Sequence, residues 1–208
     1  MSTASLSKFT VPLPSDQSAT TQGLLMPKLQ YRFGILFQNF GVSTPTTELT
    51  KQVIDANRPS VSFTPITIDV YNSKVKLNGR HEWQDMKISL RDDVTGQVQK
   101  LVGEQIQKQF DFYEQASAAS GIDYKFTTKI EMLDGGNGAF EPVVLETWEL
   151  YGCFIKDVAY GELGYGKNEV AKIDLTLVYD NAVQSPQGTG VGANVGRTNG
   201  TMVTGAGR

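Results

Sequence analysis

The stretch from Ile66 to Asp93 decides the fold, and it reads ITIDVYNSKVKLNGRHEWQDMKISLRDD. Its first part, residues 66–77, is rich in β-branched residues and predicts a strand. Asn78-Gly79 follows, and because both residues tolerate positive φ, the pair predicts a tight hairpin turn. The return strand is expected to bury one face, since apolar side chains alternate with polar ones at Met86, Ile88 and Leu90.

The same alternation of apolar and polar residues recurs along the rest of the chain. It appears in residues 29–37, 124–132, 143–155 and 173–179. The glycine-rich run Asp134–Gly138 predicts a turn after the second of these segments. Each segment is long enough for a strand with one buried face, so the sequence predicts a mainly antiparallel sheet protein.

One segment has helical periodicity instead, and it predicts a helix over about residues 93–119. Asp92 or Asp93 offers an N-cap oxygen, and Gly121 stands where a C-terminal glycine belongs. The apolar stripe repeats at three- and four-residue steps through Val94, Val98, Leu101, Val102, Ile106, Phe110 and Tyr113. The expected fold class is therefore mainly β: an antiparallel β-barrel or sandwich with one flanking α-helix.

Three segments have no clear period. Residues 1–28 are rich in Ser, Thr, Pro and Gln, and residues 183–208 are rich in glycine, so both predict extended arms on a body of residues 29–182. Such arms bury little apolar surface, and we expect them to become ordered only against neighbouring subunits. The third segment, Gly41–Pro59, predicts a long loop, and long loops in compact domains are usually functional.

The charge distribution argues against a nucleic-acid-binding protein. The chain has a net charge of −3, with +1 on residues 1–28 and +2 on residues 181–208, which leaves −6 on residues 29–180. A nucleic-acid binder needs a clustered basic face, which this acidic body does not offer. There is no run of about 18 apolar residues, so no membrane-spanning helix is expected. The start of the chain does not have the pattern of a secretory signal.

The residues that suggest chemistry do not form a catalytic or metal-binding pattern. His81 is the only histidine and Cys153 the only cysteine, so neither has the partners that a metal site or an activated nucleophile needs. Gly161, Gly166 and Lys167 fit the phosphate-loop spacing, but Asn168 replaces the required hydroxyl residue and a strand follows instead of a helix. We therefore expect no enzyme activity and no cofactor. A lone cysteine also agrees with assembly in a reducing cytoplasm.

Three stretches in this order resemble the tail-tube proteins of contractile-tailed bacteriophages, which are similar in fold to the tube subunits of pyocins and type VI secretion. The stretches are KVKLNGRHEWQDMKISLRDD (Lys74–Asp93), ELYGCFIKDV (Glu149–Val158) and NEVAKIDLTLVYD (Asn168–Asp180). The resemblance covers about residues 29–182. The glycine-rich tail departs from the family pattern, as do Asn181 and Ala182, which follow the last strand where the family has a tryptophan.

The resemblance implies a structural virion protein, made in the host cytoplasm, whose homohexameric rings stack into the channel for genome delivery. The implied partners are further copies, a tail sheath protein, and baseplate and tail terminator proteins, while DNA passes through the lumen without specific binding. An acidic lumen is typical of the family and agrees with the charge of the body. Candidate lumen-lining acidic residues are Asp69, Glu82, Asp85, Glu131, Glu146 and Asp174.

The loop Gly41–Pro59 occupies the place of the family's ring-stacking loop. We therefore expect its charged residues to contact the next ring; these are Glu48, Lys51, Asp55 and Arg58. Alternative functions remain open on the sequence alone. They are a baseplate tube initiator, a secretion or pyocin tube subunit, and a small β-barrel ligand-binding module. A ligand-binding module would need a pocket with convergent polar groups, and no pattern in the sequence indicates one.

Overall fold

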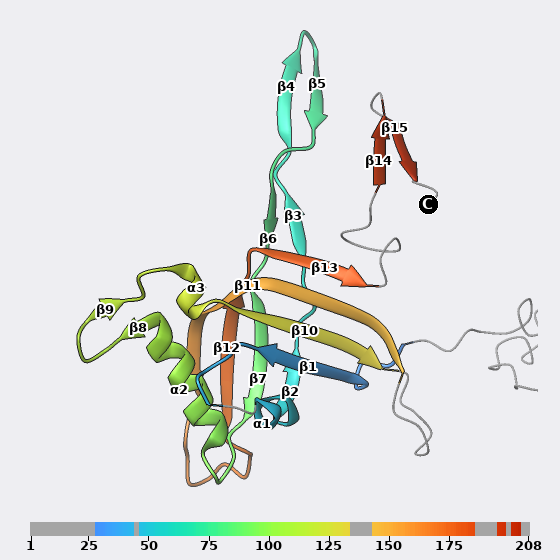
Figure 1. The fold of residues 1–208 in the computed structure, drawn as a ribbon. Helices are drawn as coiled ribbons and strands as arrows, with labels where there is room; N and C mark the ends of the chain where they lie inside the picture. Colours follow the sequence, from blue (N-terminus) through green and yellow to red (C-terminus); the bar gives the residue numbers. More distant parts are fainter. Residues whose placement is uncertain (1–27, 44–45, 134–142, 186–194, 199–200, 205–208) are drawn as a thin grey trace, which may run out of the picture.

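The computed structural model describes residues 28–43, 46–133, 143–185, 195–198 and 201–204. Within these ranges the chain is mainly β, with antiparallel strands and short helices, as the sequence predicts. The body consists of two sheets that share one long strand (Figure 1). The predicted turn Asp134–Gly138 and residues 1–27 lie outside the described residues.

Sheet A contains four antiparallel strands, in the order β1 (Phe33–Gln38), β10 (Phe126–Leu133), β11 (Val144–Tyr160) and β13 (Asn181–Ser185). Alternate residues face the core, as period-two patterning requires. The core-facing side includes Ile35, Ile130 and Leu150, all buried. Strand β13 continues to Ser185, three residues beyond the body boundary expected from the sequence.

Sheet B contains the second half of β11, followed by β12 (Lys172–Val178), β7 (Met86–Arg91) and β2 (Val53–Ala56). Strand β11 passes from one sheet to the other at Gly152, whose φ is +68°. A Cβ atom there would lie 2.1 Å from Oδ2 of Asp180. Only glycine accepts both this conformation and this contact without strain, so Gly152 forms the corner of the body.

The core fills the space between the two sheets. It includes a group of three aromatic rings, since the Phe40 ring lies 5.3 Å from the Phe37 ring and 4.9 Å from the Phe126 ring, centroid to centroid. Aliphatic side chains of sheet B complete it, and Ile88, Leu175 and others are almost fully buried. This burial is the main stabilising contribution to the fold.

The helix is shorter than predicted. Helix α2 runs from Gln97 to Gln109, and its predicted continuation is a small hairpin of β8 (Phe110–Asp111) and β9 (Ala116–Ser117). The helical stripe holds at Val98, Leu101 and Val102, which are buried, but Val94 and Tyr113 are almost fully exposed. The prediction extended the stripe through aromatic residues that instead suit a hairpin.

Both predicted helix ends are also corrected. Gly96 with φ +68° is the N-cap residue, although the Asp93 carboxylate still accepts a hydrogen bond of 3.2 Å from the first-turn amide of Val98. Gly121 begins the next helix, α3 (Gly121–Tyr124), where Ser120 forms a capping box with Asp123. The sequence contained that capping signal, and the glycine beside it was assigned to the wrong helix end.

The segment Gly41–Pro59 is not a loop. It contains helix α1 (Thr47–Lys51) and the edge strand β2, and Leu49 is completely buried. Both elements are too short to show a period, which explains why the pattern was missed. In the glycine-rich tail, β14 (Val195–Thr198) and β15 (Thr201–Thr204) pair as a hairpin.

Candidate assembly surfaces

A long hairpin projects from sheet B and is the most conspicuous surface feature of the chain (Figure 1). It continues strands β2 and β7 outward, first as β3 (Val61–Phe63) paired with β6 (His81–Trp83). It then becomes β4 (Ile66–Val70) paired with β5 (Ser73–Leu77). We call residues 60–84 the arm. At about 3.3 Å per residue, the dozen residues from its root to its tip span roughly 35 Å.

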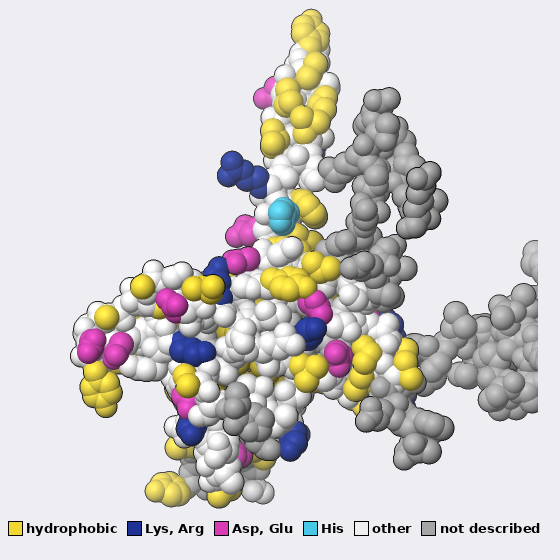
Figure 2. Space-filling model, viewed as in Figure 1, with side chains coloured by type: hydrophobic (Ala, Val, Ile, Leu, Met, Phe, Trp, Pro, Cys, Tyr) yellow, Lys and Arg dark blue, Asp and Glu magenta, His cyan; other side chains and the backbone are white. Residues whose placement is uncertain are grey.

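The outer arm has one apolar face and one polar face. Because Ile66 pairs with Leu77 and Ile68 with Val75, these side chains share a face, and each is about half exposed. The opposite face carries polar and charged side chains, among them Thr67, Asp69, Lys74 and Lys76. Figure 2 shows the apolar side chains gathered along the arm. An isolated two-stranded hairpin is marginally stable in water, and an exposed apolar face of this kind usually marks a surface that binds a partner.

The arm corrects the predicted turn at Asn78-Gly79. The chain reverses instead at Tyr71-Asn72, where Tyr71 has φ +49°. The sequence held the signal, because the apolar residues occupy even positions up to Val70 and odd positions from Val75 onward. Gly79 has a different role: a Cβ atom there would lie 2.1 Å from the carbonyl oxygen of Thr64, in the connection between β3 and β4.

Sheet A has two open edges. In the part of the chain that the structure describes, β1 pairs only with β10, and β13 pairs only with β11. All neighbours in this sheet are antiparallel, so with four strands β1 and β13 run in opposite directions. Exposed edges carry unpaired backbone groups, and proteins usually cover or pair them.

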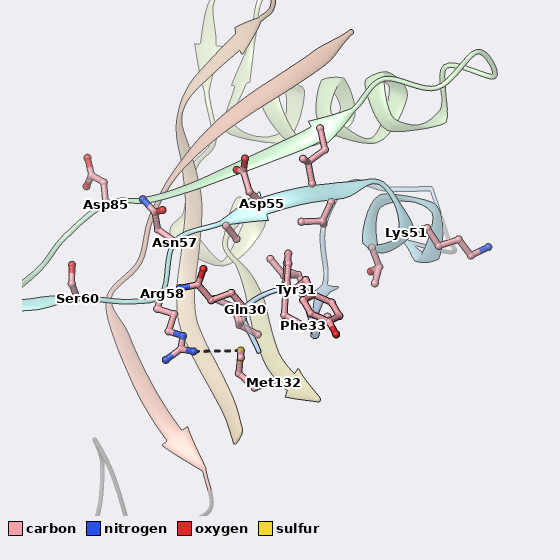
Figure 3. A pocket seen from close by; sticks show the side chains of 17 residues that line it. Gln30, Tyr31, Phe33, Lys51, Asp55, Asn57, Arg58, Ser60, Asp85 and Met132 are labelled. Atoms are coloured by element: carbon pink, nitrogen blue, oxygen red, sulfur yellow. Dashed lines mark hydrogen bonds between the residues drawn. The ribbon is translucent and has the colours of Figure 1, made fainter. Parts of the chain in front are cut away.

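A groove of about 1,110 Å³ lies beside the β1 edge, between β1 and β2, the two terminal strands of the sheet order. Its apolar lining includes Phe33, Ile35 and Met132. Figure 3 shows Arg58 reaching toward Met132, with 3.6 Å between Nη2 and Sδ. The groove thus joins an apolar floor to an open strand edge, an arrangement that accepts an added strand.

Three of the four predicted ring-stacking residues line this groove, although the segment is not a loop. Lys51 ends α1, Asp55 lies in β2, and Arg58 follows that strand. Glu48 lies in α1. The sequence therefore grouped residues that do share a surface. Their contact with a further ring stays a prediction.

The six predicted lumen residues do not share one surface. Asp69 and Glu82 lie on the arm, Asp85 at its root, Glu131 on the outer face of sheet A, Asp174 on that of sheet B, and Glu146 on the core side of β11. Asp85 pairs with Lys156 at 2.5 Å, and Asp174 accepts a 2.6 Å hydrogen bond from Ser89. Whether the exposed residues line a channel stays a prediction.

Glu146 is buried and paired inside the chain, so it supplies no free charge to a channel wall. Its side chain forms an ion pair with Lys28 and accepts hydrogen bonds from Trp148 Nε1 at 2.6 Å and Gln184 Nε2 at 2.8 Å. Burial alone raises the pKa of this carboxyl, but Lys28 and Trp148 outweigh it, and the pKa lies below its usual value. The alternation of side chains along β11 puts Glu146 on the face opposite Glu149, but it does not indicate which of the two is buried.

Helix α2 holds the chain after β1 in place. The Glu104 carboxylate accepts hydrogen bonds from the amides of Val42 (2.9 Å) and Ser43 (2.7 Å) and from the Ser43 hydroxyl (2.6 Å). The Ser43 side chain, followed by these amides, lowers the pKa of Glu104 to about 2. Next to it, buried Gln105 accepts a 2.9 Å hydrogen bond from the Gly41 amide. The helical periodicity of the sequence gives no indication of this role, because the partners of Glu104 lie about 60 residues away.

The residues that suggested chemistry in the sequence lie apart in the described structure. None of their His, Cys, Asp and Glu side chains cluster in threes that could hold a metal ion. His81 lies on the arm, where its ring is 6.5 Å from that of Trp83, centroid to centroid. The Gly161–Lys167 segment is an exposed connection between β11 and β12. None of the helices in the described ranges is long and apolar enough to cross a membrane.

Comparison with solved structures relates this architecture to known proteins. The chain resembles the anti-feeding prophage cap, described as a tube terminating cap, with a TM-score of 0.56 and 16% identity over 78% of this chain and 93% of that one. The chain shares its fold with components of contractile injection systems. A chain of the six-fold symmetrised anti-feeding prophage baseplate also matches, with a TM-score of 0.56 and 16% identity, covering 78% of this chain and 97% of that chain.

A third structure supports the same fold. It is the PVC sheath/tube terminator of an extracellular contractile injection system in the extended state, with a TM-score of 0.53 and 14% identity over 78% of this chain and 99% of that chain. No protein-family model matches the chain, and no curated protein matches it. At these identities the likeness establishes the fold, while function depends on the surfaces described above.

Proposed function

We propose that the protein is a structural, non-catalytic subunit of a tail-like tube, in which copies join into a six-membered ring and rings stack along the tube axis. The observation that carries this proposal is the arm, which presents a half-exposed apolar face on a hairpin with no partner among the described residues. A free monomer gains nothing from such a feature, whereas a polymer buries it.

The open edges of sheet A supply the joint within a ring. When copies are related by rotation, β13 of one copy runs antiparallel to β1 of the next, because the sheet contains an even number of antiparallel strands. The backbone groups of both edges then pair, and closing the ring leaves no edge exposed. The groove beside β1 gives room for the side chains of the incoming strand.

The arm supplies the contact between rings. It points away from the body along the direction of β2 and β7, and its length of roughly 35 Å exceeds the reach of an ordinary surface loop (Figure 1). A contact in which the arm of one copy meets a different surface of another copy is heterologous. Such a contact propagates a filament when it does not close on itself.

The finer assignment within this class is a tail tube that guides DNA inside a contractile sheath, in contact with baseplate and terminator proteins. The acidic body, with −6 on residues 29–180, supports a channel that does not retain DNA. A second candidate is a single-ring component at a tube end, which the likeness to cap and terminator structures supports. Copy number per particle separates the two: many rings for a tube, one for an end component.

The arm gives the test of this function. Ile68→Asp places a charge on the apolar face, and Thr67→Asp places the same charge on the polar face of the same strand. Desolvating an unpaired carboxylate in a contact costs several kcal/mol, so Ile68→Asp should abolish stacking. We expect sedimentation velocity to show large assemblies for the natural chain and for Thr67→Asp, and none for Ile68→Asp.

Circular dichroism on the same samples checks that both variants remain folded, as we expect because no residue of β4 or β5 belongs to the buried core. Equal assembly of the two variants would refute the role of the apolar face. A natural chain that stays monomeric at every concentration and salt condition would refute the proposed function itself.

A further inference from the structure

The buried carboxylate of Glu146 holds two distant parts of the chain at once. Its Oε2 atom pairs with Lys28, and its Oε1 atom accepts the hydrogen bonds from Trp148 and Gln184. Lys28 precedes β1 in the chain, and Gln184 is the penultimate residue of β13. Both ends of the body are therefore attached to one side chain on β11.

The attachment lies where β13 most needs support. Among the described residues this strand is five residues long and pairs with β11 alone, so it is expected to fray from its C-terminal end. Gln184 faces the core side opposite Trp148, and its bond to Glu146 fastens that end. Arg58, on the rim of the groove, adds a further favourable charge to the carboxylate.

We propose that Glu146 is a positioning residue: it keeps β13 flat against β11, in the form that pairs with β1 of the next copy. The pairing step rests on the proposed function, whereas the fastening of β13 does not. Glu146 is 7% exposed, and its carboxylate has three hydrogen-bond donors, so it is a satisfied anchor and not an exchangeable surface charge.

The experiment is hydrogen exchange on the full chain, dilute enough to be monomeric, with Glu146→Gln against Glu149→Gln. Glu149 is a matched control, because it lies on the opposite face of the same strand and pairs with Lys129 at 2.6 Å. We expect the amides of residues 181–185 to exchange at least tenfold faster in Glu146→Gln and to stay unchanged in Glu149→Gln. Gln184→Val removes one hydrogen-bond donor to Glu146 and leaves its ion pair with Lys28 in place. It should also accelerate exchange at residues 181–185.

Assembly provides the second readout. A general loss of stability would not weaken assembly in Glu146→Gln while leaving the monomer folded. The critical concentration for assembly should rise at least tenfold in Glu146→Gln, under conditions in which its unfolding curve shows that the monomer is still folded. Unchanged exchange at 181–185, or equal acceleration in the Glu149 control, would overturn the fastening of β13. Faster exchange with normal assembly would overturn its role in joining. A natural chain that never assembles refutes the proposed function but leaves the exchange result to decide the fastening.

Discussion

The hydrogen bonds of Glu104 predict a large and pH-dependent contribution to stability. Replacing this residue by Gln removes a carboxylate that accepts three hydrogen bonds from the backbone and side chain of residues 42–43. The amide retains one acceptor oxygen but loses the charge that strengthens these bonds. The variant therefore tests whether α2 holds the chain after β1 through this one side chain.

The magnitude follows from the pKa of Glu104, which falls from 4.5 to about 2 in the folded chain. This difference corresponds to about 3 kcal/mol at neutral pH. Because 22% of the side chain is exposed, solvent screening reduces the value, and we expect a loss of about 2 kcal/mol for Glu104→Gln. A folded-state pKa below the unfolded value means that the stabilisation is complete above pH 4.5 and disappears as the pH falls toward 2.

The assay is urea unfolding of monomeric protein at pH 7 and at pH 3, with Glu169→Gln as the control on an exposed segment. We expect the variant to be about 2 kcal/mol less stable than the natural chain at pH 7 and only about 1 kcal/mol less stable at pH 3, while the control changes neither value. If the loss in free energy of unfolding is equal at both pH values, the carboxylate is not its source. A loss below about 0.5 kcal/mol at pH 7 would mean that Glu104 does not hold residues 42–43 in place.

Three further predictions concern other parts of the chain. Gly152→Ala should cost about 2–3 kcal/mol in urea unfolding, from strain at positive φ and the contact with Asp180, while Gly166→Ala, which has open space, should cost almost nothing. Burial raises the pKa of Cys153 to about 11, so its reaction with a thiol reagent at pH 8 should be limited by unfolding; rapid labelling of the folded chain would contradict this. Residues 1–28 should exchange amide hydrogens rapidly in the monomer and slowly in assemblies, and equal rates in both states would refute their ordering on assembly.

Much of the body was predictable because its strands follow one rule. Residues 126–132 and 173–177 alternate strictly, and the structure buries the expected residues in each. Alternation reports burial directly, since successive side chains of a strand point to opposite faces. The fold class and the presence of these strands rested on this local information.

The remaining features depend on contacts between distant residues. The burial of Glu146 follows from Lys28 and Gln184, which are 118 and 38 residues away in sequence. The short elements α1 and β2 are stabilised by packing of Leu49 and by pairing with β7, and neither contact leaves a local pattern. The position of the arm turn was readable from the change of phase between Val70 and Val75, but the stronger turn motif at Asn78-Gly79 concealed it.

Electron microscopy of the purified, concentrated chain tests the ring proposal most directly. Two-dimensional class averages should show hollow rings with six-fold symmetry, or tubes built from them, and a reconstruction should place β13 of each copy beside β1 of the next in antiparallel pairing. Isolated monomers at all concentrations, or rings in which these two edges stay apart, would contradict the proposed joint between subunits.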